Sequence, residues 1–111
     1  MRPQLIKTKL KEYTFNRWTE GEYRYKLKGY KNKYGEESQY YQMLKNYGDV
    51  IISLFNRLSS IKSNIRYRNI YHGIVFIINL WKSIPSTKEK DLDELARYID
   101  MNINCLIGYM I

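Results

Sequence analysis

Residues 38–61 read SQYYQMLKNYGDVIISLFNRLSSI, and the spacing of the apolar residues in this stretch decides the fold class. From Tyr40 onward, apolar side chains recur alternately four and three residues apart, which is the period of a helix that buries one stripe. Ser38 is suited to cap the helix, and Gly48 inside it costs about 1 kcal/mol against alanine. The pattern therefore predicts a helix over about 38–62. Its stripe consists of Tyr40, Leu44, Tyr47, Ile51, Leu54, Leu58 and Ile61.

Two further helices follow from the same reasoning. A second helix over about 69–84 is apolar on nearly every side, which is typical of the central element of a bundle. Pro85 ends it, and Ser86 with Glu89 forms a capping-box pattern for a third helix over about 87–110. The second stripe is Ile70, Ile74, Ile77, Trp81 and Ile84, with Val75, Phe76, Ile78 and Leu80 beside it. The third stripe is Leu92, Ala96, Ile99, Ile103, Leu106 and Met110.

Short connections favour antiparallel neighbours, so the chain is predicted to be mostly α, a small antiparallel helical bundle with three core helices. Its 111 residues fit one domain over 1–111, with a basic, tyrosine-rich N-terminal segment 1–35 and a helical core 36–111. Apolar residues spaced four and three apart behind Pro3 predict a short basic helix at the start of the chain. Residues 14–35 fit either a further short helix or a short hairpin.

Composition narrows the classes of function. The single cysteine, Cys105, and the single histidine, His72, exclude an internal disulfide and a Cys/His zinc site, and no metal or cofactor is expected. The longest apolar run, 74–78, is far below the ~18 residues that span a bilayer, so no membrane contact is expected. Without a secretory pattern at the N-terminus, a cytoplasmic location is expected. Richness in Ile, Lys, Asn and Tyr is typical of an AT-rich genome and suggests a virus or mobile element.

Positive charge is concentrated in the first third of this basic protein. The formal net charge is +8, from 19 basic and 11 acidic residues. Residues 1–34 hold ten basic and three acidic residues, a net +7, while residues 35–68 contribute +2 and residues 69–111 contribute −1. A basic end on an otherwise balanced domain predicts an anionic partner, and nucleic acid fits a tyrosine-rich segment better than a membrane does.

Residues 22–35, EYRYKLKGYKNKYG, are the candidate binding surface. Aromatic rings would stack on unpaired bases while lysine and arginine contact phosphates, so the sequence predicts non-catalytic binding of RNA or single-stranded DNA. A helix would align Tyr23, Leu27, Tyr30 and Tyr34, whereas a strand would alternate tyrosines with basic residues. The stacking candidates are Tyr23, Tyr25, Tyr30 and Tyr34. The phosphate-binding candidates are Arg24, Lys26, Lys28, Lys31 and Lys33, with Arg66 and Arg68 as an extension of the patch.

Two alternatives stay open. In the first, the same tyrosines form a protein interface, so that the chain is an interaction module, an inhibitor or subunit of a larger nucleoprotein complex, or a homodimer. In the second, the chain is an enzyme. The stretch RYRNIYHG resembles the Arg-(four to six residues)-His motif of HEPN-type ribonucleases, which are small helical dimers that act without metal. That resemblance implies that His72 is the acid and base and that Arg66 stabilises the transferring phosphate.

A second resemblance concerns DNA-binding repressors. The stretch DELARYIDMNINCLIGYM is similar to their helix-turn-helix pattern, with Ala96 at the small position and Ile99 and Met101 flanking the turn. The resemblance implies a turn near Asp100 and a second helix that reads DNA. The unbroken apolar stripe over residues 92–110 favours one continuous helix instead.

Overall fold

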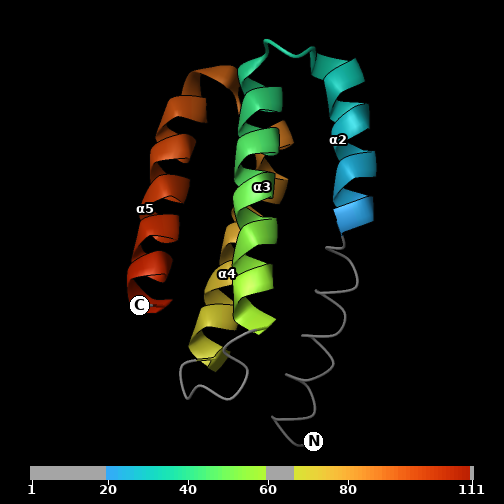
Figure 1. Cartoon of the computed structure of the whole chain (residues 1–111). Helices are drawn as coiled ribbons and strands as arrows, with labels where there is room; N and C mark the ends of the chain where they lie inside the picture. Colours follow the sequence, from blue (N-terminus) through green and yellow to red (C-terminus); the bar gives the residue numbers. More distant parts are fainter. Residues whose placement is uncertain (1–19, 60–66, 111) are drawn as a thin grey trace, which may run out of the picture.

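The computed structural model of the protein describes residues 20–59 and 67–110 (Figure 1). Four α-helices pack against one another in this part of the chain, so the predicted small helical bundle is confirmed. The helices are α2 (Glu20–Tyr34), α3 (Gln39–Ser59), α4 (Tyr67–Ser83) and α5 (Leu92–Met110). Two short 3-10 helices, η1 (Ile84–Ser86) and η2 (Glu89–Asp91), connect α4 to α5. The predicted helix at the start of the chain lies outside the described residues.

Residue types at both ends of the connection between α2 and α3 explain where the two helices end and begin. The Ser38 side chain accepts a hydrogen bond from the Tyr40 N–H (3.2 Å), which confirms the predicted cap of α3. Gly35, with a φ of 88°, ends α2 and donates its N–H to the Lys31 carbonyl (2.9 Å). Only glycine adopts this left-handed backbone at little cost, so the chain turns sharply between the two antiparallel helices.

The hairpin alternative for residues 14–35 is wrong over the part that the structure describes. Residues 20–34 are one helix, α2, and residues 14–19 lie outside the described range. A helix places Tyr23 and Tyr30 on the same side of the segment, where both rings reach α4, and leaves Tyr25 80% exposed on the other side. Burial of the helical stripe therefore prevails over the alternating pattern, which would have put Tyr23 and Tyr25 on one face.

One expectation about the last helix is corrected, and the continuous helix favoured over residues 92–110 is confirmed. The capping box is absent because Ser86 is the last residue of η1 and donates its hydroxyl to the Ser83 carbonyl at the end of α4 (3.0 Å), and α5 begins later, at Leu92. The helix-turn-helix is absent because α5 runs unbroken through Asp100. That carboxylate accepts a hydrogen bond from Tyr47 (2.8 Å), so it serves packing between α3 and α5 and not a turn.

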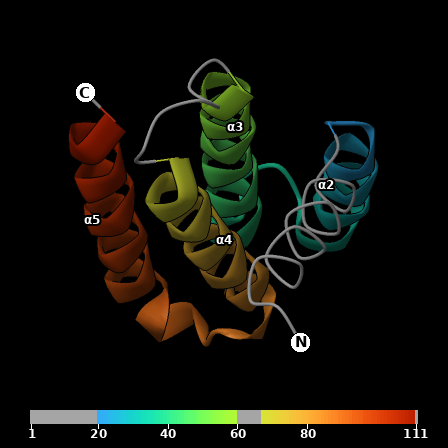
Figure 2. The same ribbon diagram turned by 90° about the horizontal axis from the view of Figure 1, so that it is seen from below.

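α4 lies between α3 and α5, whereas α2 packs on α3 at the far side from α5 (Figure 2). The predicted stripe of α4 is buried throughout, although Phe76 is exposed on the outer surface and does not join the core. The core also takes Tyr23 from α2, so this helix is packed into the bundle. None of the helices in residues 20–59 and 67–110 is both long and apolar enough to cross a membrane.

Candidate nucleic-acid interface

α2 has a buried stripe and a basic outer surface. Tyr23 is buried, and Leu27, Tyr30 and Tyr34 are half-buried against the core. The remaining described positions of the helix are exposed, and they include every predicted phosphate-binding residue of this segment. Those residues are Arg24, Lys26, Lys28, Lys31 and Lys33. Anchoring through one stripe therefore holds five cations on the solvent side of one helix.

Tyr23 is not available for base stacking, so its predicted role is wrong. Its side chain is 1% exposed, and its ring packs edge-on against Trp81 at a centroid distance of 6.2 Å. The hydroxyl donates to a pair of acceptors on α3, the Lys45 carbonyl at 2.8 Å and Asp49 Oδ1 at 3.0 Å. Withdrawing this side chain would break both bonds and expose a buried ring to water, which is costly. Tyr23 instead fastens α2 to α3.

Tyr30 and Tyr34 belong to a row of rings that joins α2 to the rest of the bundle. Tyr30 stacks on Tyr34 at 6.2 Å, and Tyr34 stacks on Tyr40 of α3 at 5.0 Å with an interplanar angle of 14°. Tyr40 in turn donates its hydroxyl to the Thr87 carbonyl (2.6 Å). These ring faces already have aromatic neighbours. Tyr25, which is 80% exposed, is therefore the predicted stacking residue whose ring is most accessible to a partner.

The five cations occupy two flanks of α2. Lys26 and Lys33 are seven residues apart and share one flank, while Arg24, Lys28 and Lys31 share the other. Lys31 bonds Glu36 at 2.7 Å, and this hydrogen bond raises the pKa of Lys31 and lowers that of Glu36. The Lys33 ammonium lies 5.2 Å from the Tyr34 ring centroid, within cation–π range. Glu36 balances the charge of Lys31 locally, so Lys26, Lys28 and Lys33 are stronger candidates than Lys31 for phosphate contacts.

The predicted extension of the basic patch lies away from the C-terminal end of α2. Arg68 is exposed in the first turn of α4, at the end of the bundle where α3 ends, whereas Lys31 and Lys33 lie at the opposite end (Figure 1). Arg66 lies outside the described residues. His72 is exposed on α4 with its ring edge-on to Tyr71 at 5.8 Å, and its pairing with Arg66 stays a prediction.

Two tyrosine hydroxyls fasten the helices in the same way, and sequence reasoning missed both. Tyr23 meets a carbonyl and, four residues later on the same helix, a carboxylate. Tyr47 repeats this arrangement on α5, where its hydroxyl lies 3.1 Å from the Ala96 carbonyl and 2.8 Å from Asp100 Oδ1. The sequence pattern that could have predicted these bonds is an aspartate on one helix opposite a tyrosine in the buried stripe of another helix. This pattern can be recognised only when it is known which helices pack together.

Gly48 of α3 is the position against which the Tyr23 ring of α2 packs. A Cβ atom added there would lie 2.6 Å from Tyr23 Cζ and 2.7 Å from its hydroxyl oxygen, closer than real contacts allow. The missing side chain also leaves two carbonyls of the preceding turn accessible. Trp81 Nε1 donates to the Leu44 carbonyl (2.8 Å), and Tyr23 donates to that of Lys45. The glycine is therefore required by packing.

The two tyrosine anchors predict a loss of stability at alkaline pH. Burial, followed by the hydrogen bond to Asp49, raises the pKa of Tyr23, and burial with the bond to Asp100 raises the pKa of Tyr47. Unfolded tyrosine titrates near pH 10, so this stabilisation is complete below pH 10 and is lost as the pH rises further. We expect the free energy of unfolding to fall by up to about 1.4 kcal/mol per pH unit for each tyrosine.

Urea unfolding followed by circular dichroism between pH 8 and about pH 12 measures this slope. Tyr23→Phe should make the fall of the unfolding free energy with pH less steep, because one of the two contributing tyrosines is removed. Tyr25→Phe, which removes an exposed hydroxyl from the same helix, is the matched control. Equal slopes in the wild type and Tyr23→Phe would contradict the assignment of the anchor.

Together these features define a small antiparallel helical bundle with one basic outer helix. Comparison of the chain with protein-family models, curated proteins and solved structures finds no match. Across residues 20–59 and 67–110, no group of three or more His, Cys, Asp or Glu side chains is placed to hold a metal ion.

Proposed function

We propose that this protein binds nucleic acid, RNA or single-stranded DNA, through the solvent face of α2. The observation that carries the proposal is that all five cations of this helix are exposed while its opposite stripe is packed against the core. The docked helix holds the cations in place before the partner arrives, so little ordering cost is added on binding.

Phosphate contacts supply most of the expected affinity. Lys26 and Lys33 are separated by about 10 Å along the helix axis, so they contact different phosphates. Four or five contacts predict a slope of about −3 in a plot of log affinity against log salt concentration for a single strand. One exposed ring, Tyr25, adds stacking of about 1–3 kcal/mol without a sequence requirement.

The distribution of charge also supports approach from the α2 side. α5, which lies on the opposite side of the bundle (Figure 2), carries Asp93, Glu94 and Asp100 against Arg97, a net charge of −2. A polyanion is therefore attracted to one side of the molecule and repelled by the other.

A pair of double variants with equal charge change tests the proposal. Lys26→Gln/Lys28→Gln removes two charges from α2, and Lys90→Gln/Arg97→Gln removes two from η2 and α5. Loss of two contacts should reduce the salt slope by about 1.4. If affinity at 1 M salt is unchanged, the same loss weakens binding about 25-fold at 0.1 M salt. Fluorescence anisotropy with labelled oligonucleotides measures both quantities.

The control variant should bind as tightly as the wild type, or slightly more weakly because of its lower net charge. Equal losses in the two variants would mean that binding follows net charge and not α2. Absence of binding to RNA and to single-stranded DNA at low salt would refute the proposed function.

A further inference from the structure

Gly29 lies on the exposed side of α2, and no packing contact requires a glycine there. Its φ is not in the left-handed region, and within the described part of the chain a Cβ atom added to it would meet nothing within 4 Å beyond the adjoining backbone of α2. Gly48 and Gly73 differ, because a Cβ atom there would collide with Tyr23 and Leu106. Glycine is the least favourable residue after proline inside a helix. A glycine without a packing reason is suited to let a ligand approach the backbone closely.

Four side chains surround Gly29 on the surface of the helix. Residues three and four positions apart are neighbours on a helix, and for Gly29 these are Tyr25, Lys26, Asn32 and Lys33. All four are exposed. An aromatic ring, two ammonium groups and an amide therefore border a bare stretch of backbone. We refer to Gly29 and these four neighbours as the Gly29 subsite.

The glycine leaves the Tyr25 ring without a covering side chain on its C-terminal side. On a helix, a tyrosine pairs readily with an apolar side chain four residues later, and that partner would stand at position 29. Helical side chains lean toward the N-terminus of their helix, so Tyr25 leans away from Gly29 and leaves the space above it open. Among the exposed large apolar side chains in the described part of the chain, Tyr25 has the largest exposed fraction. Its ring is therefore open to a ligand that lies over Gly29.

We propose that the Gly29 subsite binds one unpaired nucleotide, whose base stacks on the Tyr25 ring above the bare backbone. This inference rests on the proposed binding of nucleic acid and gives one base a position within it. Tyr25 and Asn32 are about 10 Å apart along the helix axis, and stacked bases are about 3.4 Å apart, so a base fits between them. Lys26 and Lys33 lie together on one flank, where they can meet the phosphates on either side of this nucleotide.

The Gly29 subsite favours single strands over duplexes. A base can stack on a protein ring only when it is not already paired and stacked inside a duplex. A duplex offers phosphates to Lys26 and Lys33 but no free base face to Tyr25. The ring therefore adds affinity for unpaired strands beyond what the cations supply.

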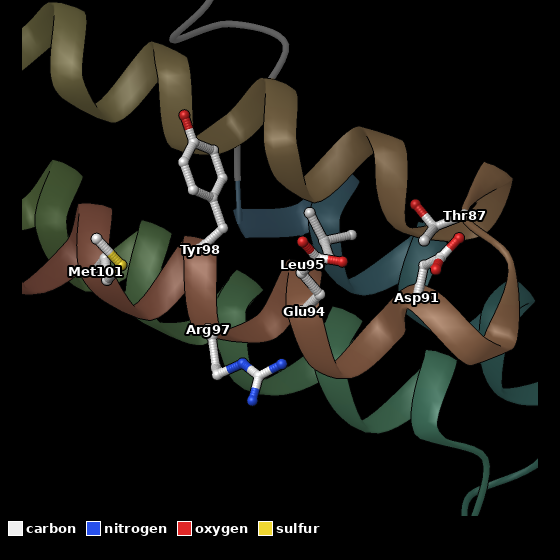
Figure 3. A pocket seen from close by; sticks show the side chains of 7 residues that line it. All are labelled: Thr87, Asp91, Glu94, Leu95, Arg97, Tyr98 and Met101. Atoms are coloured by element: carbon white, nitrogen blue, oxygen red, sulfur yellow. The ribbon is translucent and has the colours of Figure 1, made fainter.

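The exposed ring of Tyr98 on α5 lacks such surroundings. It reaches toward α4 and lines a groove with Asp91 and Glu94, whereas Arg97 points away from α4 (Figure 3). The two carboxylates would repel the phosphate of a bound nucleotide. An exposed tyrosine is therefore not sufficient for binding a nucleotide, and the neighbouring cations distinguish Tyr25 from Tyr98.

Fluorescence anisotropy of the full chain with two single strands tests the Gly29 subsite. One probe is about 12 nucleotides of oligouridylate or oligothymidylate, whichever the wild type binds more tightly, and the other is the same strand without its bases. Both probes carry the same phosphates, so only the first can stack on a ring. Stacking of one base predicts that the wild type prefers the strand with bases by about 5- to 150-fold.

Gly29→Leu fills the subsite and covers the Tyr25 ring without changing any charge, and leucine favours a helix more than glycine does. We expect it to remove most of the preference for bases and to leave affinity for the base-free strand within about twofold. Tyr25→Ala should have the same effect, and adding Gly29→Leu to it should change nothing further. Gly108→Leu, at an exposed glycine of α5 where a Cβ atom also meets nothing within 4 Å, is the matched control and should bind both strands like the wild type.

Three outcomes would overturn the Gly29 subsite and leave the proposed function standing. Equal affinity of the wild type for the two strands shows that no base is bound. A preference for bases that persists in Gly29→Leu or in Tyr25→Ala places the base elsewhere. A loss in Gly29→Leu that is equal for the two strands, or that Gly108→Leu shares, follows from a change in the helix and not from a filled subsite. Absence of binding to either strand at low salt refutes the proposed function itself, so the two failures are distinguished.

Discussion

Gly48→Ala should destabilise this protein by about 1–3 kcal/mol, although the same change in an ordinary helix stabilises the helix by about 1 kcal/mol. The added methyl group would occupy the position of the Tyr23 ring, whose Cζ lies 2.6 Å from the site of the new atom. The ring is held by hydrogen bonds to α3 and by Trp81, so it cannot shift without breaking those contacts. We therefore expect α2 to lose its packing against α3.

A double-mutant cycle separates this cause from a general intolerance of the site. Where Tyr23 has already been replaced by alanine, no ring opposes the methyl group, and Gly48→Ala should stabilise by up to about 1 kcal/mol through helix propensity. The free energy of unfolding is measured in urea for the wild type, the two single variants and the double variant. The same destabilisation in both backgrounds would show that Tyr23 is not the reason for the glycine.

Trp81→Ala should cost about 3–5 kcal/mol, because Trp81 joins α4 to both α2 and α3 at one point. It lies on α4, its indole N–H bonds the Leu44 carbonyl of α3, and its ring meets Tyr23 and Tyr30 of α2 at 6.2 and 6.1 Å. Domains of this size are stable by roughly 5–15 kcal/mol, so the variant loses a large share of its stability.

Trp81→Phe is the matched control, because it keeps a buried ring and removes the indole donor. Its cost should be smaller, about 1–2 kcal/mol, since the Leu44 carbonyl keeps its bond within α3. Circular dichroism is the suitable probe of unfolding, because the substitution removes a tryptophan. A loss below about 1 kcal/mol in Trp81→Ala would mean that α2 does not depend on this contact.

The helices of the core could be predicted from sequence because their burial follows a local period. Leu44, Ile51 and Leu54 of α3 are buried where the four-and-three spacing places them, and Ile99 and Ile103 of α5 follow the same rule. The cap at Ser38 is equally local, since its oxygen meets an N–H two residues away. Such features depend on neighbours in the chain, and the residue pattern records them directly.

The assignment of individual tyrosines could not be made in this way. Tyr23 and Tyr25 belong to the same basic run, yet the first is 1% exposed and the second 80% exposed. The difference arises because Tyr23 faces Gly48 and Asp49 of another helix. Whether a ring is available to a partner depends on that neighbour, and the pattern of charges around it carries no such information.

The sequence by itself determined the helical class, the positions of the core stripes and the concentration of positive charge near the N-terminus, because each depends on residue type and short-range spacing. The tertiary structure decided which of these residues face solvent. It removed Tyr23 from the candidate interface, exposed Phe76, and brought the rings of Phe76 and Tyr98 from separate helices into contact. These outcomes depend on contacts between residues that are distant in the chain, and only the packed helices specify them.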